Sequence, residues 1–198
     1  MHKINEICKD GKSLPLSTEG NLRVVFLGVG SAFTKRNRQS NFLIIQGDHH
    51  VLIDCGTLGS LALDDVGLSV SEVQCYLPTH SHADHIGGFE EVALVNRYLS
   101  NSSNKPKMVI PKDYQDLLWT KSLAGGLEFC EVSQGQPLEL TDFFEILCPK
   151  QMELLGKKVW SYKHGPMELI LMRSLHIPDS AISIDEAQWC TGVLVNRR

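Results

Sequence analysis

The feature that most constrains this chain is a segment with three histidines and one aspartate, residues 78–88. It reads Pro-Thr-His-Ser-His-Ala-Asp-His-Ile-Gly-Gly and lies directly after a short apolar run and directly before an amphipathic one. In an extended chain, residues two apart point to the same side, so His80 and His82 can reach one metal ion together. Asp84 and His85 fall where the chain turns into a helix, so they project towards a neighbouring point. The segment therefore predicts a strand that ends in a metal-binding loop and continues into a helix.

The residue types in this segment favour zinc. Imidazoles and a carboxylate at this spacing suit zinc or another borderline divalent metal. Gly87 and Gly88, which follow, let another backbone segment approach closely. A helix cap with surface histidines is the alternative interpretation, but this pattern rarely arises by chance in a chain with 8 histidines.

Apolar runs separated by turn residues predict a strand-rich chain with several helices. Short apolar runs predict strands at residues 22–30, 41–46, 51–54, 73–77, 107–110, 129–132, 143–147, 168–175 and 191–195. Apolar residues at helical spacing predict helices at residues 56–68, 89–99 and 114–123. Two strand-rich halves flanked by helices indicate an α/β (α+β) fold in which sheets pack together under helices. We expect a single domain over residues 1–198, with residues 1–20 as a polar leader.

The composition excludes several classes of protein. Hydrophobic residues make up 42% and charged residues 21% of the 198 residues, as in soluble globular chains and unlike disordered, collagen-like or coiled-coil sequences. No apolar run is long enough for a membrane-spanning helix, and the first residues lack the apolar stretch of a secretory signal. Six cysteines are scattered without a Cys-x-x-Cys pair, which favours reduced thiols and a cytoplasmic protein.

The segment 79–88 resembles the signature of the metallo-β-lactamase superfamily. The glycine-containing loop at residues 27–32, together with residues 38–41, is similar to the ribonuclease Z-like branch of that superfamily. The resemblance runs from about Leu22 to the end of the chain. It implies a metallo-β-lactamase αββα four-layer sandwich with metal ions at the shared edge of two sheets, here lacking the last strands of the second half.

The resemblance implies a role for each matching residue. The first metal ion would be held by His80, His82 and a later histidine, and the second by Asp84 and His85. Residues 51–56 look like the first family motif, whose aspartate, here Asp54, supports the metal-binding histidines through hydrogen bonds. A carboxylate that closes an apolar strand can orient a ligand imidazole in any case, although an aspartate that caps a turn is the alternative. The cofactor implied is one or two zinc ions per chain, with manganese or iron as alternatives.

Two histidines, His164 and His176, are candidates for the later ligand of the first metal ion. His176 closes the apolar strand expected at residues 168–175, and the chain breaks directly after it, which is the family's setting for this ligand. The long interval between His85 and His176 implies an insertion. His164 looks more like a turn residue, and an ordinary surface histidine is the alternative for either position. We expect His176 to be the ligand.

The sequence departs from the family pattern near its end. The family supplies a metal-bridging aspartate after the next strand, expected here at residues 191–195, and then a final histidine. No histidine follows His176, and Asp179 and Asp185 precede that strand. A short homologue, a site completed by another chain, and a site with a single metal ion held by three histidines all fit this pattern. An incomplete sheet leaves an exposed edge, which favours a homo-oligomer, for example a dimer.

The chemistry expected of such a site is metal-assisted hydrolysis. Metal-bound hydroxide, available near neutral pH, would attack phosphorus or a carbonyl carbon, and Asp84 would act as the catalytic group that orients the nucleophile. Three cations of the first loop, Lys35, Arg36 and Arg38, could bind substrate phosphate and favour a phosphodiesterase. A solvated charged loop is the alternative interpretation of these cations.

The substrate class follows from the charge of the chain. Its net charge is −4, whereas a protein that binds nucleic acid through its overall field would be basic. A nucleotide or other small phosphodiester, for example a cyclic nucleotide, therefore suits the chain better than long RNA. Two alternatives differ in class: a hydrolase of a carbonyl ester or thioester, and a non-catalytic, metal-stabilised binding or regulatory module.

Overall fold

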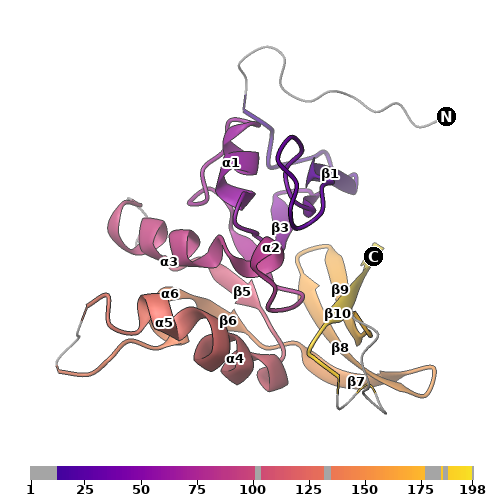
Figure 1. Cartoon of the computed structure of the whole chain (residues 1–198). Helices are drawn as coiled ribbons and strands as arrows, with labels where there is room; N and C mark the ends of the chain where they lie inside the picture. The colour runs from indigo at the N-terminus through magenta and orange to yellow at the C-terminus, as the bar shows by residue number, and fades with distance from the viewer. Residues whose placement is uncertain (1–12, 101–103, 132–134, 177–183, 185–186, 198) are drawn as a thin grey trace.

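A computed structural model describes residues 13–100, 104–131, 135–176, 184 and 187–197 of the chain. Its first sheet has six strands in the order β1-β2-β3-β4-β5-β6 (Figure 1). The strands are β1 (Arg23–Gly28), β2 (Asn41–Gln46), β3 (His49–Ile53), β4 (Cys75–Leu77), β5 (Lys107–Val109) and β6 (Glu145–Leu147). The first three strands pair antiparallel, and the pairs from β3 to β6 are parallel. The parallel strands carry nearly continuous apolar runs because both faces of this part of the sheet are covered.

The second sheet has four antiparallel strands in the order β10-β9-β8-β7. They are β7 (Lys150–Leu154), β8 (Lys157–His164), β9 (Met167–Arg173) and β10 (Thr191–Arg197). Leu169 and Leu171 on β9 belong to the same buried cluster as Leu52 on β3 and Met108 on β5. The two sheets therefore share one apolar core between their inner faces.

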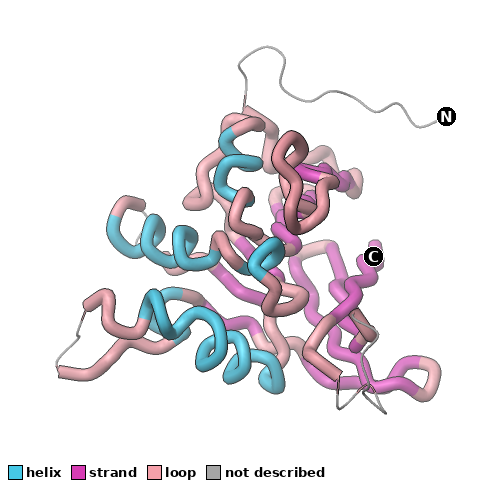
Figure 2. The backbone as a smooth tube through the Cα atoms, viewed as in Figure 1, coloured by secondary structure: helices cyan, strands magenta, loops and turns pink. Residues whose placement is uncertain are grey.

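All helical segments of the described residues precede β6. They are α1 (Gly59–Asp64), α2 (Ala83–Ile86), α3 (Phe89–Tyr98), α4 (Lys112–Leu118), the π-helical turn η1 (Trp119–Leu123), α5 (Ala124–Leu127) and α6 (Leu140–Phe143). Figure 2 shows them gathered on one side of the molecule and the second sheet on the other. Tyr76 of β4 meets Phe89 of α3 ring to ring at 5.6 Å, so the helices cover the outer face of the first sheet. The described residues thus supply three layers of the expected four.

Two differences from the sequence prediction concern strands. The strand expected at residues 129–132 is wrong: residues 129–131 form a turn, and Val132 lies outside the described residues. The β7–β8 hairpin was not predicted, because β7 is mostly exposed and carries no apolar run. Its two-residue turn has Leu155 at φ 52° and Gly156 at φ 73°, the positive angles of a tight hairpin turn. No helix of the described part of the chain is long and apolar enough to cross a membrane.

Candidate metal centre

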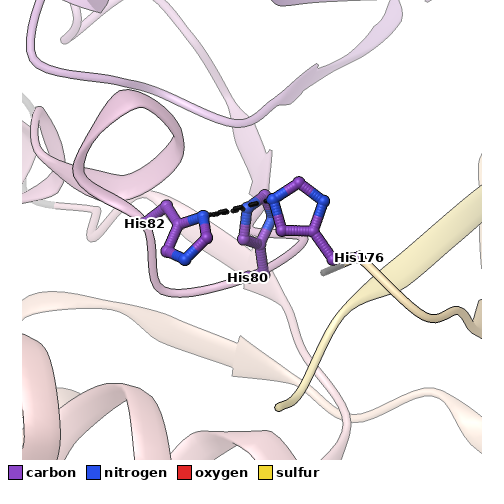
Figure 3. Close-up of side chains that lie close together, drawn as sticks. All are labelled: His80, His82 and His176. Atoms are coloured by element: carbon purple, nitrogen blue, oxygen red, sulfur yellow. Dashed lines mark hydrogen bonds between the residues drawn. The ribbon is translucent and has the colours of Figure 1, made fainter. Parts of the chain in front are cut away.

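The candidate site lies where the carboxyl ends of neighbouring strands meet. Asp54 follows β3, and His80 follows the parallel strand β4, so both residues reach the same edge of the first sheet. His176 arrives from the second sheet, three residues after the end of β9. Figure 3 shows the rings of His80, His82 and His176 pointing toward one another. Residues 94 positions apart in the sequence thus meet at one point.

The three histidines present one ring nitrogen each to a common space. His80 Nε2 lies 3.1 Å from His82 Nδ1, which in turn lies 3.2 Å from His176 Nε2. In a tetrahedral zinc site with Zn–N distances of about 2.0–2.1 Å, ligand nitrogens lie roughly 3.3 Å apart. His80 is buried, His82 is half-buried and His176 is exposed, so the cluster opens to the surface on one side. This donor set fits a zinc ion or a similar divalent metal.

Hydrogen bonds from Asp54 through Thr79 to His80 Nδ1 leave His80 Nε2 available to bind a metal. Asp54 Oδ2 accepts a bond from the Thr79 hydroxyl at 2.9 Å, and Oδ1 accepts the Thr79 backbone N–H at 2.7 Å. Because the Thr79 hydroxyl donates to Asp54, it accepts from His80 Nδ1, 3.0 Å away. The proton of neutral His80 is therefore on Nδ1, and the lone pair on Nε2 faces the other two histidines. Burial, with the nearby histidines, lowers the pKa of His80 to about 3, so its imidazole is neutral.

Asp54 also forms a hydrogen bond with a second histidine, His85. His85 Nδ1 lies 2.6 Å from Asp54 Oδ2, and His85 Nε2 lies 3.4 Å from a carboxylate oxygen of Asp84. Burial opposes protonation of His85, but the bond to Asp54 and the charges of Asp54 and Asp84 raise its pKa overall. Burial also raises the pKa of Asp54. Asp54 itself sits at φ 62°, a backbone conformation that is uncommon outside glycine and recurs at functional sites.

Close backbone packing holds the two loops of the site together. Cys55 N–H donates to His85 O at 2.8 Å, and Gly88 N–H donates to Cys55 O at 2.9 Å. A Cβ atom on Gly88 would lie 2.7 Å from Gly56 O, and one on Gly56 would lie 2.0 Å from Asp84 O. The close approach expected at Gly88 is thus present. Gly56 has the same role, which sequence reasoning missed because the partner segment is distant in the chain.

The structure separates the two candidate histidines of the second sheet. His176 joins His80 and His82 in a group whose ligand atoms all lie within 4.8 Å of one another. His164 ends β8, opposite the first residue of β9, and therefore lies at the other end of the sheet. Its Nε2 donates to the backbone oxygen of His50 at 3.0 Å. The described residues hold no group of three ligating side chains around Asp84 and His85.

The direction of β10 bears on the ligands that the family pattern places near the end of the chain. The pattern has a metal-bridging aspartate after the strand expected at residues 191–195, and β10 runs away from the site. It begins beside the site, where Cys190 pairs with His80, and it is antiparallel to β9. A residue after β10 would therefore lie at the far end of the sheet, and only a strand that returns could carry an aspartate to the site. Asp179 and Asp185 lie outside the described residues.

The first-loop cations differ in their surroundings. Arg38 forms a paired contact with Asp65, from Nε to Oδ2 at 2.6 Å and from Nη2 to Oδ1 at 3.0 Å. Its guanidinium is thus engaged within the protein, and the pKa of the Asp65 carboxyl is lowered accordingly. Lys35 and Arg36 are exposed on the same loop. Gln39 anchors this loop beside the site, because its side chain contacts Thr57 Oγ1 at 2.9 Å.

Solved structures of low sequence identity share this fold. The short form of human tRNase Z matches with a TM-score of 0.60 and 16% identity, covering 88% of this chain and 64% of that one. The metallo-β-lactamase fold protein YhfI from Bacillus subtilis matches with a TM-score of 0.58 and 15% identity, covering 88% of this chain and 58% of that one. The α/β fold class of the metallo-β-lactamase type is therefore confirmed.

Sequence relatives identify the family within this fold. An Anti-Pycsar protein Apyc1 from Paenibacillus sp. (strain J14) is 36% identical over 157 residues, which cover 79% of this chain and 59% of the relative. The Apyc1 of Paenibacillus xerothermodurans is 33% identical over 162 residues, covering 81% and 60%. The Apyc1 of Bacillus phage vB_BsuM-Goe3 is 36% identical over 125 residues, covering 63% and 47%. The chain thus spans about half to three fifths of the length of these curated relatives.

The family profile described as "Anti-Pycsar protein Apyc1" matches residues 22–198, nearly the whole of the chain. This range contains every strand of both sheets and all the histidines of the candidate site. The chain therefore belongs to the Anti-Pycsar protein Apyc1 family.

Proposed function

We propose that this chain is a zinc-dependent phosphodiesterase that hydrolyses a small nucleotide, with cyclic nucleotides as the first candidates. The observation that carries the proposal is the convergence of His80 Nε2, His82 Nδ1 and His176 Nε2, with ring nitrogens as close as 3.1 and 3.2 Å. Three histidines leave a fourth position open, which distinguishes catalytic zinc sites from closed structural ones. Exposed His176 gives a substrate access to that position.

A divalent ion held by the three histidines would supply Lewis-acid activation of water and of a phosphoryl oxygen. Asp54 and Thr79 keep the His80 ring in the required tautomer and orientation. Asp84 lies beside His85, whose ring centroid is 4.0 Å from that of His80, and its carboxylate would orient the attacking water and accept its proton. With His85 it would also offer two ligands to a second ion.

The charge distribution supports a small anionic substrate. The net charge of −4 disfavours binding of long RNA, whereas Lys35 and Arg36 offer local positive charge on a loop anchored beside the site. Arg38 is less suited to phosphate binding because Asp65 already engages its guanidinium. The anti-Pycsar name of the relatives also suggests a nucleotide-type substrate.

The incomplete second ligand set favours one competing function, a non-catalytic module that binds metal. The two can be separated by measuring hydrolysis of a panel of cyclic mononucleotides, and of bis(p-nitrophenyl) phosphate as a generic phosphodiester, before and after zinc is removed. We expect hydrolysis that is lost on chelation, restored by zinc and abolished by His80→Ala. Exposed His49, outside the site, provides the matched control: His49→Ala should leave hydrolysis unchanged. Zinc binding without hydrolysis of any substrate would support the module instead.

We also propose a homo-oligomer in the cytoplasm. In the described residues β10 is an edge strand of the second sheet, and exposed strand edges favour association. Light scattering of the purified chain tests this part, and a monomer at all concentrations would contradict it.

A further inference from the structure

The segment that carries two of the candidate ligands has an anchor on the side away from the site. Ser81 separates His80 from His82, and in an extended segment its side chain points opposite to theirs. Its hydroxyl oxygen lies 2.9 Å from the hydroxyl oxygen of Tyr114. Tyr114 belongs to α4 and is fully buried, so its position is fixed by the surrounding core. The buried Tyr114 side chain thus anchors the histidine loop, residues 80–82, on the side opposite the candidate site.

The Tyr114 ring also contacts the part of the second sheet that borders the same loop. It stacks on Trp189 with ring centroids 5.4 Å apart and planes 6° from parallel. Trp189 directly precedes Cys190, which pairs with His80, and the next residue, Thr191, donates its backbone N–H to Thr79 O at 3.2 Å. Tyr114 therefore touches both the histidine loop and the strand start that flanks it.

The stack is itself held in place from the second sheet. The Trp160 ring centroid lies 5.4 Å from that of Trp189, and the guanidinium carbon of Arg173 lies 4.5 Å from the Trp189 centroid. Arg173 is the last residue of β9, the strand that leads to His176. One aromatic cluster thus lies between the segments that bring His80 and His176 to the same point.

We propose that Tyr114 is a positioning residue that sets the spacing of the histidine ligands through Ser81, an inference that rests on the metal site proposed above. Asp54 orients His80 and His85 from the first sheet. Tyr114 holds the intervening residue Ser81 and so limits rotation of the segment that carries both His80 and His82. Without the hydroxyl contact, the two ring nitrogens lose their common orientation, and the preorganisation of the site is reduced.

The test is the affinity of the chain for a metal, measured by titration of the metal-free protein with Zn²⁺ and with Co²⁺. Tyr114→Phe keeps the ring, its burial and its stack on Trp189, and removes only the hydroxyl. We expect metal affinity to fall about tenfold, the lower end of the effect of contacts that orient metal ligands. The visible spectrum of bound Co²⁺, which reports coordination geometry, should change as well.

Tyr76→Phe is the matched control. Tyr76 is also fully buried, and its hydroxyl donates to Val70 O at 2.6 Å, away from the histidine loop. Its loss should lower stability to a similar extent and leave metal affinity and the Co²⁺ spectrum unchanged. Ser81→Ala removes the same hydroxyl contact from the other side, so the double variant with Tyr114→Phe should bind metal no more weakly than either single variant.

The outcomes separate the two proposals. If the unaltered chain binds Zn²⁺ and Tyr114→Phe binds it equally tightly with the same Co²⁺ spectrum, the positioning role is wrong and the metal site stands. Additive losses in the double variant would also overturn it, because they would show that the two hydroxyls act independently. If the unaltered chain binds neither ion, the metal site proposed above is wrong and the positioning role falls with it.

Discussion

The described residues hold two histidine clusters at opposite ends of the sheets, and only one of these two is suited to a metal. At the candidate site, ring nitrogens of His80, His82 and His176 face one another. At the other end, His164 Nε2 donates to His50 O at 3.0 Å, and His50 Nε2 accepts the backbone N–H of Gln74 at 2.9 Å. The bond from His164 to His50 therefore joins the two sheets, whereas the bond from Gln74 to His50 lies within the first sheet. The orientation of the ring nitrogens, rather than the number of histidines, distinguishes a candidate metal site from a structural hydrogen bond between the sheets.

The largest expected effect is a loss of metal affinity in His176→Ala, and the same change at His164 in the other cluster is its control. His176→Ala removes one of the three proposed ligands, so we expect metal affinity to fall by more than the roughly 10–100-fold that contacts around metal ligands contribute. His164→Ala should leave metal affinity unchanged, because that nitrogen faces a backbone oxygen. Calorimetric titration of both variants with Zn²⁺ checks the pair, and equal losses in the two would remove the distinction between the clusters.

A smaller loss of metal affinity should follow Asp54→Asn. The amide keeps the shape of the carboxylate but presents one acceptor oxygen in place of two, while Thr79 and His85 both need an acceptor. The proton of His80 is then no longer confined to Nδ1, and we expect metal affinity to fall about 10–100-fold. The same titration measures this loss of metal affinity. An unaltered affinity would show that the hydrogen bonds of Asp54 do not orient the proposed ligands.

The hydrogen bond from His164 to His50 should contribute to the free energy of unfolding. His164→Ala leaves His50 O buried without its partner, which costs about 1–3 kcal/mol. Urea unfolding of the metal-free chain measures this loss as a lower midpoint. The exposed neighbour His49, altered to alanine in the same way, is the control and should lower the midpoint much less. An unchanged urea midpoint in His164→Ala would mean that the hydrogen bond from His164 to His50 contributes nothing to stability.

The smallest effect concerns pH. Burial lowers the pKa of His164 to about 4 from an ordinary value of 6.5, so the folded chain keeps it neutral where the unfolded chain takes up a proton. Its contribution to stability is therefore complete above pH 6.5 and declines as the pH falls towards 4. Burial lowers the pKa of His50 too, which acts in the same direction. Urea midpoints of the metal-free chain should fall across this range, and less steeply in His164→Ala.

Much of the fold was predictable because buried strands carry continuous apolar runs. The strand at 41–46 is confirmed residue for residue as β2. The helix predicted at 114–123 is longer in the structure, where α5 carries the helical segment on to Leu127, which is fully buried in the core. The β7–β8 hairpin escaped prediction because its register depends on pairing and turn geometry rather than on burial of apolar residues.

The candidate site was predictable in its residues and not in its connections. Histidines two apart after a strand already indicate a shared point, so His80 and His82 could be chosen from spacing. The contact from Asp54 through Thr79 depends on the parallel pairing of β3 with β4, which no local pattern specifies. The direction of β10 likewise depends on its antiparallel pairing with β9, so the place of any further ligand could not be predicted from the order of residues.

The most direct test of the account is the number of metal ions bound per chain, measured by elemental analysis of the purified protein after loading with zinc and removal of the excess. The three-histidine site predicts one tightly bound ion per chain, lost in His176→Ala. Two ions per chain would mean that further ligands complete the pair formed by Asp84 and His85. No bound ion in the unaltered chain would contradict the central claim that the three histidines form a metal site.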